Sequence, residues 1–192
     1  YLDICRVNID NGELTTVVSS NAEYTVLASR SMDNFGLYKL GLPDPVFNDS
    51  GVSSDGKYVV GTRSRVDQLP VSFVLDKEGQ QVMELEGAKI TGLPENWQWP
   101  EPVQLTAADG KTLIYGAIFR PSDFCPKKTY PVIDCSLCLS DLAIVPKGSF
   151  SSAALGGCWY LQAAALAELG FIIVIMDGRG TAFRERDRKS VV

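Results

Sequence analysis

The sequence predicts an antiparallel β domain followed by an α/β layer. Residues 1–90 consist of short apolar-alternating runs separated by turn residues, the pattern of half-buried strands. Residues 92–102 then carry three prolines and two tryptophans, which is typical of an irregular connection. Beyond it, an apolar run, an Ala/Leu-rich stretch and a second apolar run follow one another. That order predicts a βαβ crossover.

The first part is predicted to contain hairpins. Residues 1–9 and 13–18 are expected to pair because Asp10, Asn11 and Gly12 between them supply the positive φ of a tight turn. Further strands are expected at 57–62, 71–75 and 81–85, with turns at 54–56 and 76–79. Strands joined in this way suit a propeller blade or a sandwich, and their periodicity does not separate the two.

The segment 92–102 is interpreted as the crossing between two domains, with a boundary near Trp99. The predicted domains therefore cover residues 1–98 and 99–192. Trp97 and Trp99 could line a binding cleft between the domains or simply pack the crossing segment. Packing is the favoured interpretation.

The second domain is predicted to open with a hairpin. Residues 102–107 and 112–119 flank the turn Ala108-Asp109-Gly110. A buried strand is expected next, at residues 130–135.

A helix and a strand are expected after that buried strand. Residues 153–169 are rich in Ala and Leu and stop at Gly170, the residue best suited to a left-handed C-terminal cap. Residues 171–176 are all apolar, as in a strand buried on both faces.

Composition excludes some classes of partner. The chain has 192 residues, of which 45% are hydrophobic, and a formal net charge of −5. This acidic balance argues against nucleic acid or an anionic membrane as the main partner. The apolar run 171–176 is far shorter than the roughly 20 residues that span a bilayer. The chain begins at Tyr1 without a basic and apolar leader, so its localisation is not readable from the sequence.

The cysteines do not form a disulfide framework. Their number is odd and they are scattered, so most are expected to be buried thiols: Cys5, Cys125, Cys135, Cys138 and Cys158. Cys135 and Cys138 have the spacing of a metal or redox pair, but no second pair and no His accompany them. Structural thiols are the favoured interpretation, and no cofactor-binding or metal site is predicted.

A complete serine-hydrolase triad is missing from these residues, because the chain contains no His to act as the base. It also lacks a Gly-x-Ser-x-Gly elbow, since Asp55 stands where the last Gly of residues 51–55 would have to be. That segment is interpreted as a turn leading into a strand. Ser149, Ser151 and Ser152 precede the predicted helix and are interpreted as N-capping residues.

The sequence Asp177-Gly178-Arg179-Gly180 follows the last predicted strand. It lacks the spacing and the Lys of a phosphate-binding loop. A tight turn held by a structural Asp or Arg contact is the favoured interpretation. The mixed-sign run 184–189 is expected to be a solvated surface or a frayed end.

Four segments in succession resemble the prolyl oligopeptidase and dipeptidyl peptidase IV family of serine peptidases. The last propeller blade of bacterial members is resembled by residues 54–58 with 64–67 and 70–72, and the hairpin that opens the α/β-hydrolase domain by residues 108–111 with 115–116 and 119–122. The strand before the oxyanion loop is resembled by residues 130–133. The next helix end, strand and turn are resembled by residues 167–171 through 177–181. Residues 1–49 fit a preceding blade by continuity alone.

The resemblance implies C-terminal blades of a β-propeller over residues 1–98 and the N-terminal portion of an α/β-hydrolase catalytic domain over 99–192. The chain would stop before the nucleophile elbow, so the Ser, Asp and His of the triad are expected beyond residue 192 and the fragment itself would be inactive. The parent would hydrolyse short peptides, releasing N-terminal dipeptides with Pro or Ala at the second position. The resemblance also leaves room for a homodimer and leans toward a periplasmic or secreted location.

The sequence departs from the family at one functional place. Leu137 stands at about the position where related sequences carry a Tyr that helps to hold the oxyanion, and residues 134–141 contain no Gly. Loss of such a donor costs about 3 to 4 kcal/mol of transition-state stabilisation. Either activity is reduced or the stretch contains a local sequence error; residues 181–184 depart from the family in a similar way.

Two alternatives to the peptidase therefore stay open. One is a non-catalytic protein whose propeller and hydrolase shell act as a binding module. The other is an independent small β-rich domain, which is disfavoured because the strands near Tyr130 and Phe171 would leave exposed hydrophobic edges.

Overall fold

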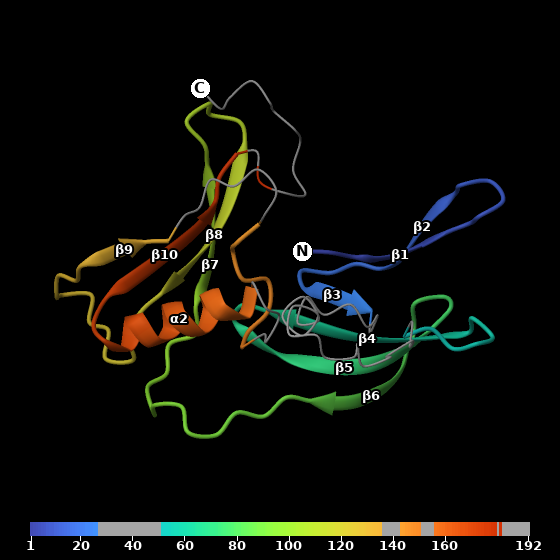
Figure 1. Cartoon of the computed structure of the whole chain (residues 1–192), viewed down its shortest axis with the longest axis horizontal. Coiled ribbons are helices and arrows are strands. Elements are labelled where there is room, and N and C mark those ends of the chain that lie inside the picture. Colours follow the sequence, from blue (N-terminus) through green and yellow to red (C-terminus); the bar gives the residue numbers. More distant parts are fainter. Residues whose placement is uncertain (27–50, 136–142, 151–155, 180, 182–192) are drawn as a thin grey trace, which may run out of the picture. The chain divides into compact units, whose positions relative to one another are not determined.

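The computed structural model describes residues 1–26, 51–135, 143–150, 156–179 and 181 (Figure 1). The chain divides into two compact units. The first comprises Tyr1–Lys89 and Lys147–Ser149, and the second comprises Ile90–Pro146 and Phe150–Val192. The predicted assignment of residues 1–98 and 99–192 to a propeller and a hydrolase domain stays a prediction.

The first unit begins with the predicted hairpin. Strands β1 (Ile4–Val7) and β2 (Leu14–Val18) pair antiparallel. The turn between them closes with a hydrogen bond from the Gly12 amide to the Asn8 carbonyl (2.8 Å), and Gly12 has a φ of 73°. The positive φ explains why a Gly stands there.

A four-stranded antiparallel sheet follows in the same unit. Its order is β3-β4-β5-β6, a simple meander of neighbouring strands. Such a meander is the form of a propeller blade. The strands are β3 (Glu23–Val26), β4 (Tyr58–Arg65), β5 (Gln68–Asp76) and β6 (Gln81–Gly87).

The turns of this sheet are held by Asp side chains. Before β4, Asp55 accepts hydrogen bonds from the Ser53 hydroxyl (2.7 Å) and the Lys57 amide (3.1 Å). Between β5 and β6, Asp76 accepts from the amides of Glu78 and Gln80. The interpretation of residues 51–55 as a strand-leading turn is confirmed.

The core of the first unit lies between the hairpin and the sheet. Tyr24 and Phe73 meet edge to face with ring centroids 5.9 Å apart, a favoured aromatic geometry. The buried cluster consists of Ile4, Ala22, Tyr24, Phe73 and Leu75, with Val17, Val18 and Val26 packed against it. The hairpin therefore contributes Ile4, Val17 and Val18 to the core that it shares with the sheet.

The second unit contains a mixed four-stranded sheet of order β7-β8-β10-β9. β7 pairs antiparallel with β8 and β8 with β10, whereas β10 and β9 are parallel. The strands are β7 (Glu101–Thr106), β8 (Leu113–Phe119), β9 (Val132–Asp134) and β10 (Ile172–Asp177).

Helix α2 (Gly156–Glu168) connects the two parallel strands and packs on β10 and β8. This confirms the predicted βαβ crossover. The helix ends as expected, with Gly170 at a φ of 95° and its amide bonded to the Ala167 carbonyl (2.8 Å). Tyr160 of the helix meets Phe119 of β8 edge to face at 5.2 Å, so helix and sheet share one core.

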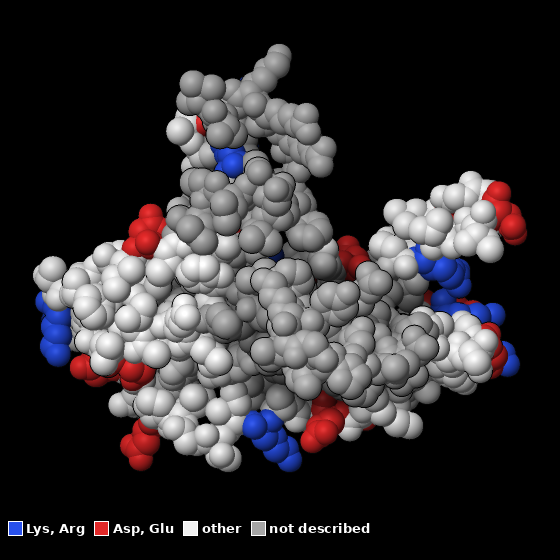
Figure 2. All heavy atoms as spheres, in the orientation of Figure 1, with Lys and Arg blue, Asp and Glu red and all other residues white. Residues whose placement is uncertain are grey.

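The described surface carries charges of both signs. Figure 2 shows acidic and basic side chains interspersed over the visible described residues. Within the described part of the chain, no helix has the length and apolar character needed to cross a membrane.

Candidate functional site

The carboxyl ends of β9 and β10 point to the same edge of the sheet because the two strands are parallel, paired from Val132↔Ile172 to Asp134↔Val174, and β10 continues beyond this pairing to Asp177. In sheets with parallel strands, binding and catalytic groups gather outside this edge. The chain leaves β9 through Cys135 and leaves β10 through Gly178. We therefore take this edge, with the described residues that directly follow the two strands, Cys135 and 178–179, as the candidate site.

Asp177, the last residue of β10, is the buried charged group of this edge. It is 1% exposed, and its Oδ1 accepts hydrogen bonds from the backbone amides of Ile144 (2.7 Å) and Val145 (3.1 Å). A carboxylate can be buried at tolerable cost only when such donors replace its hydration. Asp177 thus attaches the backbone at residues 144 and 145 to the end of β10.

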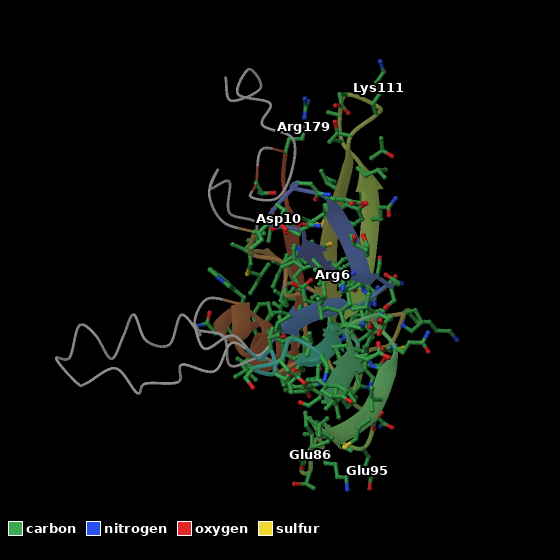
Figure 3. All side chains as sticks on the ribbon, turned by 90° about the vertical axis from the view of Figure 1, so that its right-hand side faces the viewer. Arg6, Asp10, Glu86, Glu95, Lys111 and Arg179 are labelled. Atoms are coloured by element: carbon green, nitrogen blue, oxygen red, sulfur yellow. The ribbon has the colours of Figure 1, made fainter. Side chains whose placement is uncertain are left out.

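The turn after Asp177 is attached in two further places. Thr181 Oγ1 donates to the Gly178 carbonyl (3.1 Å), and the Arg179 guanidinium lies 3.5 Å from the Asp109 carboxylate. Figure 3 shows Arg179 at the same end of the sheet as Lys111, which belongs to the β7–β8 turn with Asp109. The predicted tight turn with a structural Asp or Arg contact is confirmed, and both residues make one.

Asp109 is strongly held in its ionised form. The Thr112 hydroxyl, which donates to Oδ2, is the main reason that the pKa of Asp109 falls to about 2. The amides of Thr112 and Lys111 add to this, and the positive charge of Arg179 makes a smaller contribution. The β7–β8 turn therefore presents a permanent negative charge to Arg179 at neutral pH.

Cys135 follows β9 at the same edge. Its amide donates to the Val174 carbonyl (2.9 Å), which continues the β9–β10 ladder by one residue. Burial raises the pKa of the Cys135 thiol, and the Asp134 carboxylate raises it further. A thiol with a raised pKa is a poor nucleophile at neutral pH, and the structural role of Cys135 and Cys138 stays a prediction.

The other cysteines fit the prediction only in part. The sequence predicts that most cysteines are buried, but Cys125 and Cys135 are only half-buried and Cys5 is exposed. Cys5 is exposed because β1 is an outer strand of a two-stranded hairpin in which only Ile4 is buried. Among the described residues, no group of three or more His, Cys, Asp or Glu side chains could hold a metal ion. Leu137 and Cys138 lie outside the described residues, as do the side-chain surroundings of Cys158.

The predicted N-cap role is also wrong for Ser149. Its hydroxyl donates to the Gln68 carbonyl (2.7 Å), and its amide donates to Ser64 Oγ (3.2 Å). Ser149 is 1% exposed, so these bonds satisfy a buried hydroxyl within the first unit. Ser151 and Ser152 lie outside the described residues.

Trp97 and Trp99 take part in an aromatic cluster of the second unit. Trp97 meets Trp99 with ring centroids 6.5 Å apart and Phe150 at 5.8 Å, and Phe150 meets Tyr160 at 4.8 Å with the rings tilted by 52°. Phe150 has a φ of 45°, which is uncommon for a residue with a Cβ. The two tryptophans thus pack with other rings of the second unit, and Trp99 is still 39% exposed.

Sequence reasoning missed Ile144 and Val145 as the partners of Asp177. They contribute backbone amides, which every residue other than proline carries, and the two residues lie more than 30 positions from Asp177. No residue signal could have identified them.

Comparison with known proteins gives the same architecture. No protein-family model and no curated protein sequence matches the chain. A solved putative dipeptidyl aminopeptidase IV from Bacteroides ovatus matches 93% of it with a TM-score of 0.63 and 22% identity. Porphyromonas gingivalis dipeptidyl peptidase 4 also matches 93% of it, with a TM-score of 0.56 and 17% identity.

The chain has a dipeptidyl peptidase 4-like fold. The resemblance inferred from the sequence segments is therefore confirmed at the level of fold. The match runs through the blade-like sheet as well as the βαβ sheet, since it covers 93% of the chain. The chain spans about a fifth of the length of either dipeptidyl peptidase, because it covers 21% of each.

Proposed function

We propose that this chain is part of a serine-type peptidase that hydrolyses short peptides by releasing N-terminal dipeptides with Pro or Ala at the second position. The observation that carries the proposal is the fold match to dipeptidyl peptidases over 93% of the chain. In this proposal the chain contributes the last blades of a β-propeller and the first part of an α/β-hydrolase domain. Short peptides are its substrates.

The mixed sheet of the second unit suits the proposed hydrolase domain. Such enzymes place the nucleophilic Ser on a sharp turn between a strand and a helix, with Asp or Glu and then His following in the chain. β9 stands at one end of the described sheet, and Val132 of that strand is 61% exposed. A further strand carrying the Ser elbow would add to the sheet on this side and cover Val132.

The proposed reaction follows from those groups. Ser would attack the peptide carbonyl while His takes up its proton and later returns it to the leaving amine. The propeller would limit entry to small or unfolded peptides. Each reacting side chain is assigned to the protein beyond residue 192.

A second candidate function is a non-catalytic binding protein with the same two domains. The identity of Leu137 favours it, because an aliphatic side chain cannot donate the hydrogen bond of a Tyr hydroxyl to an oxyanion.

Labelling with a fluorophosphonate separates the two candidates. The probe reacts covalently with a Ser only when a neighbouring base activates it. We expect the full-length protein to be labelled on one Ser, and its Ser→Ala variant at the labelled position to stay unlabelled. Absence of labelling in the folded full-length protein would exclude the peptidase and leave the binding protein.

A further inference from the structure

We infer that Asp177 is a positioning residue for the proposed peptidase reaction, because its buried carboxylate holds the backbone of Ile144 and Val145 at the carboxyl end of β10. The inference rests on the proposed function. Asp177 itself touches no reacting atom in this account. It acts through the backbone that it holds.

The hydrogen bonds from Ile144 and Val145 to Asp177 form a strong contact. One oxygen, Oδ1, accepts two consecutive amides at 2.7 and 3.1 Å. Asp177, Ile144 and Val145 are 1%, 4% and 7% exposed, so water does not compete for these donors. Hydrogen bonds from amides to an ionised acceptor are about twice as strong as neutral ones. Removal of the acceptor would leave two buried amides unpaired, which is unfavourable where water cannot replace it.

The position of the contact connects it with the candidate site. The chain that leaves β9 is bonded to β10 at Cys135, whose amide donates to the Val174 carbonyl. It is bonded to β10 again at Ile144 and Val145 through Asp177. Val174 and Asp177 are three residues apart on one strand, or roughly 10 Å. The attachment through Asp177, the last residue of β10, therefore lies at the edge where α/β sheets carry reacting groups.

Asp177 is itself presented by a rigid support. It is paired with Tyr115 of β8 at the end of the β8–β10 ladder. The turn that follows is fixed by the bond from Thr181 to Gly178 and by the ion pair between Arg179 and Asp109. A positioning group works best when its own backbone cannot move.

We expect the Asp177→Ala variant to lose about 10²-fold in kcat per active site, because a displacement of about 1 Å near reacting groups costs that much. Asp177→Asn keeps an acceptor oxygen at the Oδ1 position and should restore most of the rate. Asp177→Glu keeps the charge but moves the oxygens farther from β10, so it should resemble the Ala variant.

Glu168, an exposed carboxylate, provides a control at the other end of β10. Its Oε1 also accepts two hydrogen bonds, from the Ser122 amide (3.1 Å) and the Ser122 hydroxyl (2.7 Å), but at the end of α2 just before β10 begins. Glu168→Ala removes a carboxylate with the same number of bonds at the opposite edge of the sheet. It should keep the wild-type kcat per active site.

The experiment uses the full-length protein and its four variants. Active sites are counted with a fluorophosphonate, and kcat and KM are measured with Ala-Pro-p-nitroanilide on the folded fraction. A purely structural role would lower the number of active sites but leave kcat per site unchanged in Asp177→Ala, and this result would overturn the inference. If Asp177→Ala does not fold, the comparison of Asp177→Asn with Asp177→Glu tests the inference. An equal kcat per site in these two variants would also overturn the positioning role of Asp177.

The two proposals fail in different ways. If the wild-type protein is folded but not labelled, the proposed function fails and the role of Asp177 in catalysis fails with it. If the wild type is labelled and cleaves the substrate while Asp177→Ala has an unchanged rate per site, only the inference on Asp177 is wrong.

Discussion

Asp109 closes the β7–β8 turn with its carboxylate. Oδ1 accepts the amides of Lys111 (2.9 Å) and Thr112 (2.8 Å), and Oδ2 accepts the Thr112 hydroxyl. Gly110, with a φ of 72°, supplies the left-handed residue that the turn needs. The same carboxylate pairs with Arg179, so one residue connects the hairpin to the turn after β10.

The ionised Asp109 should make stability depend on acid pH. Its pKa is about 2 in the folded protein, whereas an unfolded Asp has a pKa of about 3.9. The unfolded state therefore binds more protons between these values, and the contribution of Asp109 is fully present above pH 4 and lost as the pH falls toward 2. We expect Asp109→Ala to lower the melting temperature of the full-length protein at pH 5 and to lower it less at pH 2.5.

The exposed Asp123 of the same unit serves as the control for this pair of measurements. The change in melting temperature that Asp123→Ala causes should not shrink in this way between pH 5 and pH 2.5. A difference in melting temperature between wild type and Asp109→Ala that stays constant from pH 5 to pH 2.5 would contradict the role assigned to the Asp109 carboxylate.

At the scale of single residues, local turn chemistry could be predicted and long-range partners could not. Asp109 and Gly110 form the turn that their types indicate, because an Asx bond and a positive φ depend on neighbours within a few residues. Ser149 precedes a helix in the sequence, but its hydroxyl bonds to Gln68, 81 residues away. That distance is set by the tertiary fold.

At the scale of elements, β8 and β10 approach each other closely at Gly116. Gly116 is buried and pairs with Met176. A Cβ on Gly116 would lie 2.0 Å from Met176 Sδ and 2.7 Å from the Ile175 carbonyl oxygen. The Met176 side chain can turn away, but the backbone carbonyl cannot move without distorting the ladder. The pairing of β8 with β10 therefore requires a glycine at residue 116.

We expect Gly116→Ala to destabilise the second unit by about 1 to 3 kcal/mol, the usual cost of forcing an extra carbon into a packed site. Gly87→Ala in β6 is the matched control, because its Cβ would meet Val71 Cγ2 at an ordinary 3.8 Å. Thermal unfolding of the full-length variants, with hydrogen exchange of the β8 peptides, measures both effects. An equal loss of stability in Gly116→Ala and Gly87→Ala would contradict the close approach of β8 and β10 at Gly116.

The types of the elements followed from sequence patterns, whereas their neighbours did not. The apolar run of β10 and the Ala/Leu-rich stretch of α2 identify a buried strand and a helix, and their order indicates a crossover. The position of β10 between β8 and β9 has no such signal. The position of β10 in the sheet depends on which strands bury each other's faces. An apolar run is compatible with several neighbouring strands.

At the scale of the whole molecule, one unit contains a blade-like antiparallel sheet and the other a mixed sheet with a βαβ crossover. The change from hairpins to a strand-helix-strand order predicted this sequence of architectures. The inclusion of Lys147–Ser149 in the first unit was not predictable. Their contacts with Ser64 and Gln68 join residues more than 80 positions apart, and no composition shift marks them.

Sequencing the gene past codon 192 is the sharpest test of the proposal that these residues are part of a serine peptidase. We expect a continuous reading frame with a Gly-x-Ser-x-Gly elbow, followed by an Asp or Glu and then a His. A stop codon directly after codon 192, or a continuation whose elbow lacks its Ser, would contradict the proposal.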